Sequence, residues 1–111
     1  MENKSDILPL NSQPSTEESK NRLDELRKLI DKLDDELLEI LAKRMKVSVE
    51  IGKFKKENNI PIEQSDRWRD LIKDRLNKAK NLNLNPKFIQ KLLQLIHDES
   101  IQKQNDVINT R

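Results

Sequence analysis

Apolar residues recur every three or four positions along a proline-free stretch from Asn21 to Asn58. They fall at Leu23, Leu26, Ile30, Leu33, Leu37 and Ile40, and again at Val47, Ile51 and Phe54. This spacing places them on one side of a single long amphipathic helix. A helix of about 36 residues is about 54 Å long, which is more than the rest of a small domain can cover. The pattern therefore indicates that a partner chain covers the apolar side, and we expect a homodimer.

Two shorter helices are expected in the second half of the chain. The first runs from an N-cap at Ser65 to about Lys80. Asn85-Pro86, a cap residue followed by a proline suited to the first helical turn, starts another that reaches about Val107. The composition is 38% charged and 3% aromatic with a single glycine, which favours helices over strands. We predict an all-α fold with three helices per chain, the first of them very long.

The first twenty residues differ from the rest. They are polar, include two prolines and show no apolar period. We interpret residues 1–20 as a disordered tail or a linker that could join the domain to something upstream, and residues 21–108 as the helical domain. Ser15, Thr16 and Ser19 are candidate caps for the long helix.

Charge and cysteine content exclude several classes of function. The 22 basic and 20 acidic residues are interleaved, which is typical of a solvated surface and not of a nucleic-acid interface. The absence of cysteine excludes disulfides and thiolate metal sites. No apolar run is long enough to span a membrane, and the first residues lack the apolar core of a signal peptide. We expect a cytoplasmic protein.

Arg44 interrupts the apolar side of the long helix, because it occupies the next apolar position after Ile40. A guanidinium there is costly unless an anion meets it, which could be a ligand or a buried acid of the partner chain. Lys55 projects from nearly the same side, with about 16 Å between the two Cα atoms. Arg27 lies about 42 Å from Lys55 along the axis, so it could serve the same ligand only from the other chain of an antiparallel dimer. Singly, Arg27 and Lys55 also suit a solvated surface.

The last helix carries a similar anomaly, because Ser100 and Gln104 continue its apolar side. Each has a simpler explanation: the serine could bond back to its own helix, and the glutamine could mark the helix end. Arg67 could be a surface residue beside Asp70, and His97 suits a packed or exposed position better than a ligand or a base. We find no catalytic triad, glycine-rich phosphate loop or metal cluster. Cations with neutral donors suit a polyanionic small molecule and a reaction that needs no nucleophile, metal or other cofactor.

Together these residues resemble the all-helical type of chorismate mutase. The similarity extends from about Arg22 to Gln104 and includes LDELRKLIDKLDDELLEILAKRMKVSVEIGKFK, then IP, DRWRDL and IHDES followed by Gln104. The resemblance implies an intertwined helical homodimer with two equivalent sites shared between subunits, and rearrangement of chorismate to prephenate in the aromatic amino acid branch of the shikimate pathway. It implies that Lys55 and Gln104 hydrogen-bond the ether oxygen of chorismate. The substrate-binding residues would be Arg44, Arg67, Gln64 and Ser100 of one chain and Arg27 of the other.

Two positions depart from the pattern of the family. Its members often have an acid in place of Gln64, and a glutamate that engages the substrate hydroxyl in place of Trp68. Isochorismate pyruvate lyases are similar, use a comparable cationic set and lack that glutamate, so they are the alternative. The DRW and IHDES segments also resemble mutase domains fused to a deoxyheptulosonate phosphate synthase, which makes such a synthase a possible partner. A weakly catalytic dimerisation or regulatory module of that synthase is a further alternative.

Overall fold

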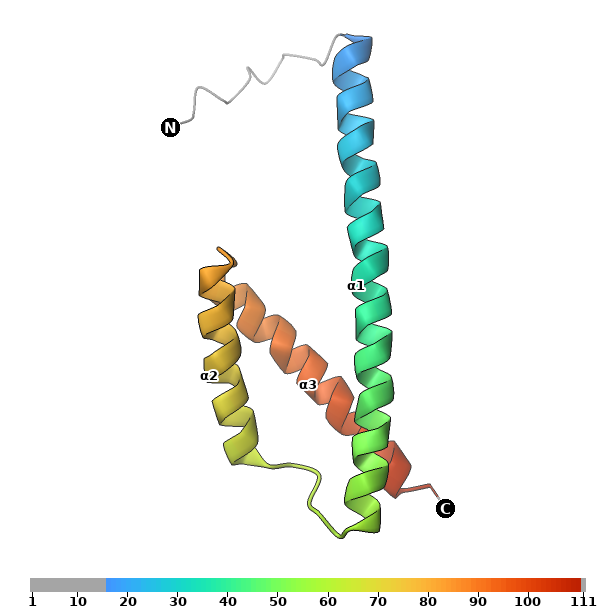
Figure 1. Cartoon of the computed structure of the whole chain (residues 1–111), viewed down its shortest axis with the longest axis vertical. Helices are drawn as coiled ribbons and strands as arrows, with labels where there is room; N and C mark the ends of the chain where they lie inside the picture. Colours follow the sequence, from blue (N-terminus) through green and yellow to red (C-terminus); the bar gives the residue numbers. More distant parts are fainter. Residues whose placement is uncertain (1–15, 111) are drawn as a thin grey trace. The chain divides into compact units, whose positions relative to one another are not determined.

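The structure, a computed structural model, describes residues 16–110 and contains three helices there (Figure 1). These are α1 (Glu17–Glu57), α2 (Ser65–Asn81) and α3 (Pro86–Ile108). Within the described range no residue belongs to a strand, so the prediction of an all-α chain with three helices is confirmed. None of these helices combines the length and the apolarity that crossing a membrane requires.

The chain divides into two compact units, Met1–Glu39 and Ile40–Arg111. The described part of the first unit is Thr16 and the earlier portion of α1, and every residue of it is exposed. The second unit contains the remainder of α1 together with α2 and α3. The packing and the polar site described below belong to this second unit.

Helix α1 begins earlier than the sequence indicated. The hydroxyl oxygen of Thr16, one of the expected caps, accepts a hydrogen bond from the backbone N–H of Ser19 at 3.0 Å. Glu17 and Glu18 follow, where their charges suit the positive end of the helix dipole. Helix α1 therefore starts within the last four residues of the segment interpreted as a tail or linker, because the capped first turn is already helical. The expectation for residues 1–15 lies outside the described part of the chain.

The predicted N-cap is wrong for α2 and correct for α3. Gln64, and not Ser65, is the N-cap of α2: its backbone is extended, its side chain makes no capping bond, and Ser65 is the first helical residue. At α3 the prediction is confirmed. The side-chain oxygen of Asn85 accepts from the backbone N–H of Lys87 at 2.9 Å, and Pro86 occupies the first turn.

Helices α1 and α3 approach each other closely at Gly52. A Cβ added to this glycine would lie 2.9 Å from the Cα of Gln104. One turn earlier on both helices, the hydroxyls of Ser48 and Ser100 are hydrogen-bonded to each other. All four residues are buried. Because Ser48 pairs with Ser100 and Gly52 with Gln104, the two helices run in the same direction at this contact.

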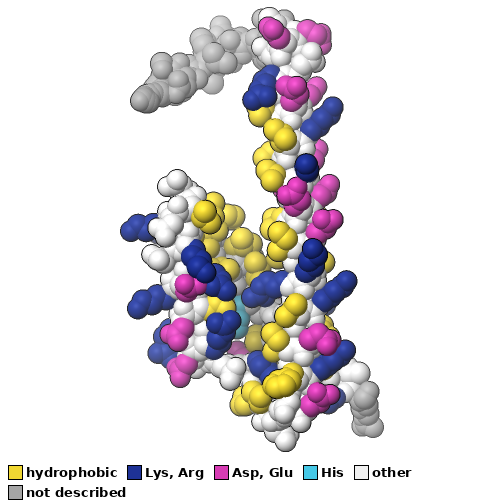
Figure 2. Space-filling model, viewed as in Figure 1, with side chains coloured by type: hydrophobic (Ala, Val, Ile, Leu, Met, Phe, Trp, Pro, Cys, Tyr) yellow, Lys and Arg dark blue, Asp and Glu magenta, His cyan; other side chains and the backbone are white. Residues whose placement is uncertain are grey.

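Large apolar side chains are largely exposed in the single chain. Among the described residues, Ala79 is the one hydrophobic residue that is buried. On α1, by contrast, Ile30 and Leu33 are each 57% exposed and Phe54 is 59% exposed. Figure 2 shows hydrophobic side chains on the surface of α1. The described chain therefore has very little core of its own.

The close contact at Gly52 generates a prediction about stability. Gly52→Ala gains about 1 kcal/mol of helix propensity but overpacks the contact, at a cost of about 1–3 kcal/mol. We expect overpacking to win, because the atom that the new methyl meets is the backbone Cα of Gln104, which cannot rotate away. Thermal melting followed by circular dichroism should show a lower melting temperature. The matched control is Asn77→Ala on the exposed side of α2, which should melt at or above wild type; a Gly52→Ala protein that does the same would contradict the prediction.

Candidate functional site

A polar cavity of about 230 Å³ lies in the second unit, among all three helices and the loop between α1 and α2. Its lining combines cationic, neutral polar and apolar side chains: Arg44, Ile51, Lys55, Ile62, Gln64, Arg67, Trp68, Leu71, His97, Ser100, Ile101 and Gln104. Six of the seven residues that the sequence indicated for a site are in this set. The seventh, Arg27, is an exposed residue of the first unit.

Lys55 is held by two hydrogen bonds at one side of this cavity. Its ammonium donates to the backbone oxygen of Ile62 at 2.5 Å and to Oε1 of Gln104 at 2.9 Å. An ammonium has three hydrogens, so one remains for a ligand, and the Gln104 amide keeps its NH₂ group as a second donor. Burial lowers the pKa of Lys55 from the ordinary lysine value, because the charged form loses hydration.

Arg44 is surrounded by like charge. Its pKa is lowered by burial first, then by the positive charges of Arg75 and Arg67. The residues that line the cavity, all of them in the described chain, include no aspartate or glutamate. In the single chain the Arg44 side chain is only partly withdrawn from water: it lines the cavity and still reaches solvent. The gathering of cations without a matching acid is nevertheless what an anion-binding site requires.

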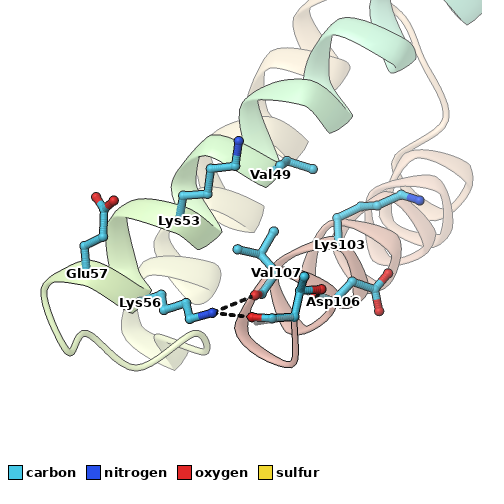
Figure 3. A pocket seen from close by; sticks show the side chains of 8 residues that line it. Val49, Lys53, Lys56, Glu57, Lys103, Asp106 and Val107 are labelled. Atoms are coloured by element: carbon cyan, nitrogen blue, oxygen red, sulfur yellow. Dashed lines mark hydrogen bonds between the residues drawn. The ribbon is translucent and has the colours of Figure 1, made fainter.

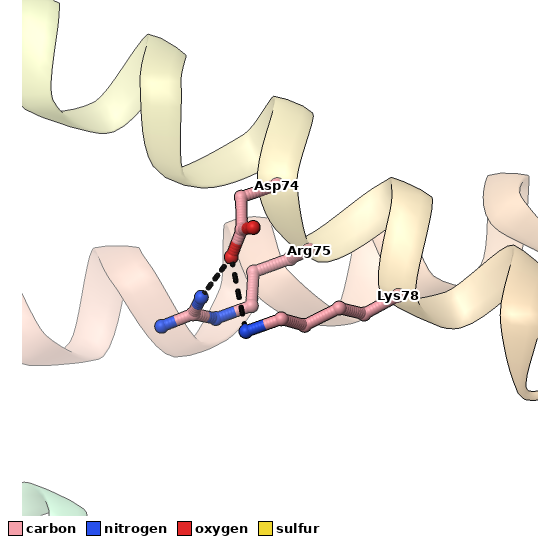
Figure 4. Close-up of polar contacts among 3 residues, drawn as sticks. All are labelled: Asp74, Arg75 and Lys78. Carbon is pink, nitrogen blue, oxygen red and sulfur yellow. Dashed lines mark hydrogen bonds and ion pairs between the residues drawn. The ribbon is translucent and has the colours of Figure 1, made fainter.

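Arg75, which sequence reasoning did not single out, has its own acidic partner on α2 (Figure 4). Asp74 accepts from Arg75 at 2.5 Å and lies 3.3 Å from the ammonium of Lys78. The hydrogen bond from Lys78 is the largest cause that lowers the pKa of the Asp74 carboxyl. Asp74 therefore offsets the charges of Arg75 and Lys78 on α2, whereas Arg44 and Arg67 face the cavity without such a partner in its lining.

Ser100 and Gln104 are the two buried residues of α3, as their places on the apolar side predicted. The two simpler explanations from the sequence are wrong. Ser100 bonds across to Ser48 of α1, and not back to its own helix, and α3 continues beyond Gln104 to Ile108. Both side chains line the cavity.

Trp68 and His97 form an aromatic pair that sequence reasoning missed. Their rings are stacked, with centroids 3.8 Å apart and planes inclined by 21°. Both are half-buried and line the cavity, one from α2 and one from α3. Helical spacing offered a signal, because His97 lies one turn before Ser100 and Trp68 follows Arg67 directly. The stacked pair thus joins α2 and α3 at the cavity.

A larger hollow of about 520 Å³ lies near the C-terminal ends of α1 and α3 (Figure 3). Lys56 crosses it and donates to the backbone oxygens of Val107, at 3.3 Å, and Thr110, at 2.5 Å. These bonds tie the C-terminal end of α1 to the residues around the end of α3. Its other lining cations, Lys53 and Lys103, each have a carboxylate on their own helix within 4 Å. The lining of this hollow also includes Glu57 and Asp106, whereas the smaller cavity has cations and no acid in its lining. We take the smaller cavity as the candidate functional site.

Comparison with known proteins identifies the family of this chain. The profile of the chorismate mutase type II family matches residues 26–105. The chain is 37% identical over 91 residues to a bifunctional chorismate mutase/prephenate dehydratase of Buchnera aphidicola subsp. Schizaphis graminum, an alignment that covers 82% of this chain and 24% of the relative. The bifunctional protein of the same name from Escherichia coli K12 is 37% identical over 90 residues, 81% of this chain and 23% of its own.

A shorter relative matches along most of its length. The chorismate mutase of Methanocaldococcus jannaschii is 31% identical over 86 residues, which are 75% of this chain and 86% of the relative. The chain thus spans about a quarter of the bifunctional relatives. Those relatives are named for a dehydratase and not for the deoxyheptulosonate phosphate synthase expected from the sequence, so the comparisons do not support a synthase partner. From the match over residues 26–105 and these relatives, the chain belongs to the chorismate mutase type II family.

Proposed function

We propose that the protein is a chorismate mutase, an isomerase that rearranges chorismate to prephenate. The observation that carries the proposal is the Lys55–Gln104 pair, held by a 2.9 Å hydrogen bond in a cavity that Arg44 and Arg67 also line. Chorismate has two carboxylates, and its rearrangement is concerted, with no covalent bond to the protein. A cavity with cations and neutral donors supplies what such a reaction requires.

The first requirement is to hold chorismate in its folded, reactive conformer. Arg44, Arg67 and the partner subunit's Arg27 bind the carboxylates in this proposal, since a guanidinium can donate two parallel hydrogen bonds to one carboxylate. Ser100 and Gln64 add neutral contacts from the cavity wall. Holding the reacting ends together in this way removes much of the entropic part of the barrier.

The second requirement is to stabilise the negative charge that develops on the ether oxygen as its bond breaks. The free ammonium hydrogen of Lys55 and the NH₂ group of Gln104 are the two donors for that oxygen. Gln104 can present its NH₂ group because Lys55 occupies its Oε1. Donors fixed in advance stabilise a transition state without reorganising, and each contributes on the order of a hundredfold or more in rate.

A second copy of the chain completes the molecule in this proposal. The apolar side of α1 is exposed, with Ile30, Leu37 and Val47 between 49% and 57% accessible in the single chain. At about 25 cal/mol per Å² of apolar surface, its burial in an antiparallel dimer is strongly favourable. Arg27 is about 42 Å from Lys55 along the helix, which is too far for both to contact one small ligand within a chain. In the antiparallel dimer, Arg27 contributes to the site of the other subunit instead.

The first prediction concerns the two ether-oxygen donors. Lys55→Ala and Gln104→Ala should each lower kcat for chorismate on the order of a hundredfold or more, because each removes a transition-state hydrogen bond. Turnover is measured by the loss of chorismate absorbance. Helicity and dimerisation should be kept.

Lys53→Ala is the matched control, because Lys53 lies on the same helix, is exposed and is absent from the cavity lining. It should retain near-normal turnover. Isochorismate is assayed in parallel, with pyruvate release as the signal. Near-normal kcat in both site variants, or pyruvate release from isochorismate without chorismate turnover, would contradict the proposed function.

The lowered pKa of Lys55 generates a second prediction. Burial favours the neutral amine, so Lys55 loses its proton at a pH below 10.5, the ordinary lysine value. The kcat/KM of the wild type should therefore fall on the alkaline side, starting below pH 10.5. Glutamine does not titrate and arginine stays charged there, so the residual activity of Lys55→Ala should lack this decline. An identical alkaline decline in both proteins would assign it to another group.

The third prediction tests the shared site. An inactive Arg27→Ala chain and an inactive Lys55→Ala chain, carrying different affinity tags, are mixed, allowed to exchange subunits and purified as mixed dimers. Each mixed dimer has one site with both residues intact and one site that lacks both. Activity should return to roughly half that of wild-type dimers, because one of two sites is restored.

A site built within one chain, or an Arg27 without a catalytic role, predicts a different result. In the first case neither site of the mixed dimer is complete, and no activity returns. In the second case the Arg27→Ala homodimer is already active before mixing. Either finding would remove the shared-site arrangement while leaving the tests of Lys55 and Gln104 unaffected.

A further inference from the structure

Ser48 is a buried polar residue that the mechanism above does not use. It is 3% exposed, lies on α1 and does not line the cavity. Its hydroxyl is hydrogen-bonded to the hydroxyl of Ser100, which is 8% exposed and does line the cavity. A hydroxyl between two packed helices costs stability unless its hydrogen-bonding groups are satisfied, so this pair has a structural reason to stay together.

The position of Ser48 ties it to the functional residues. Arg44, Ser48, Gly52 and Lys55 recur at helical spacing along one side of α1, so Ser48 lies between the cavity cations on the side that faces α3. Gly52 fixes the approach of α3 one turn later, against Gln104. The close backbone contact between the two helices therefore fixes the distance between Ser48 and Ser100, and their short side chains leave little freedom to change it.

Counting donors shows what this bond can do. A serine hydroxyl has one hydrogen to donate and two lone pairs to accept with. If Ser100 donates to Ser48, it presents lone pairs to the cavity, where they would repel an anion. If Ser48 donates to Ser100, the Ser100 hydrogen can point into the cavity and donate to a ligand there. Each of the two hydroxyl hydrogens then has an acceptor. A bound carboxylate favours the second arrangement, and each bond in such a chain strengthens the next.

We propose that Ser48 is a positioning residue for the substrate: it donates its hydrogen to Ser100, and thereby orients the Ser100 hydroxyl to donate to a carboxylate of the bound ligand. This inference rests on the proposed function, in which the ligand is a dicarboxylate. Ser48 touches neither the substrate nor the reacting atoms. It acts through Ser100 alone, and its effect falls on ligand affinity, because the carboxylate is present before and after the rearrangement.

A double-mutant cycle tests the inference with Ser48→Ala, Ser100→Ala and the double variant. Ser48→Ala should raise KM for chorismate roughly three- to tenfold, the effect of one hydrogen bond, while kcat stays within about twofold of wild type. In the Ser100→Ala background the same change should alter KM by less than about twofold, because the group through which Ser48 acts is gone. Melting curves set an assay temperature at which all four proteins are folded.

Calorimetric binding of prephenate to the same four proteins separates this inference from the proposed function. Prephenate carries two carboxylates, so its dissociation constant should show the same coupling whether or not chorismate is turned over. Failure of the wild type to turn over chorismate, with prephenate bound and the coupling present, would overturn the proposed function and leave this inference standing. A Ser48→Ala effect that is equal with and without Ser100, or that falls on kcat, or that is absent, would overturn the inference.

Discussion

The close approach of α1 and α3 at Gly52 is the constraint on which the site depends. With 2.9 Å between a Cβ at this position and the Cα of Gln104, no side chain fits there without a shift of backbone. The approach brings Gln104 within hydrogen-bonding distance of Lys55 and sets Ser48 against Ser100. Polar residues at a helix contact are costly unless each finds a partner, and here each does. The same contact therefore packs the two helices and fixes the donors of the cavity.

Much of this arrangement could be predicted from the sequence, because several residues of the site are polar residues that interrupt the apolar pattern of a helix. Arg44, Ser100 and Gln104 stand where apolar residues are expected, and all three line the cavity. Asn85-Pro86 specifies the start of α3 through local chemistry, and the structure agrees. Other features depend on tertiary contacts. A small residue such as Ser48 looks like packing until its partner is known. Likewise, Trp68 stacks on His97 between two helices. The apolar pattern of one helix cannot predict how that helix is placed against another.

Two features of the single chain lack a complementary group: the cations of the site have no acid beside them in its lining, and the apolar side of α1 has no covering surface. Arg44 carries a lowered pKa because burial, Arg75 and Arg67 all oppose its charge, and the lining of the cavity contains no acid to offset it. Like charges held together cost stability, and an anionic ligand that joins them returns that free energy as binding. The exposed apolar residues of α1 would also gain free energy from a binding partner, since their burial against a second copy would stabilise the chain. In the proposed function, an anionic ligand would offset the cations of the cavity, and a second copy of the chain would cover the apolar side of α1.

The choice of lysine at position 55 follows from the number and direction of its hydrogens. A guanidinium would spread its charge over a planar fork suited to two carboxylate oxygens, whereas an ammonium concentrates it on one atom. Two of the three hydrogens of Lys55 are bound by Ile62 and Gln104, so the third has a fixed direction before any ligand arrives. Accepting that bond also orients the Gln104 amide, which leaves its NH₂ group as the neighbouring donor. In the proposed function, one side chain thus supplies a donor and orients another, which is the preorganisation that a charge developing on a single oxygen requires.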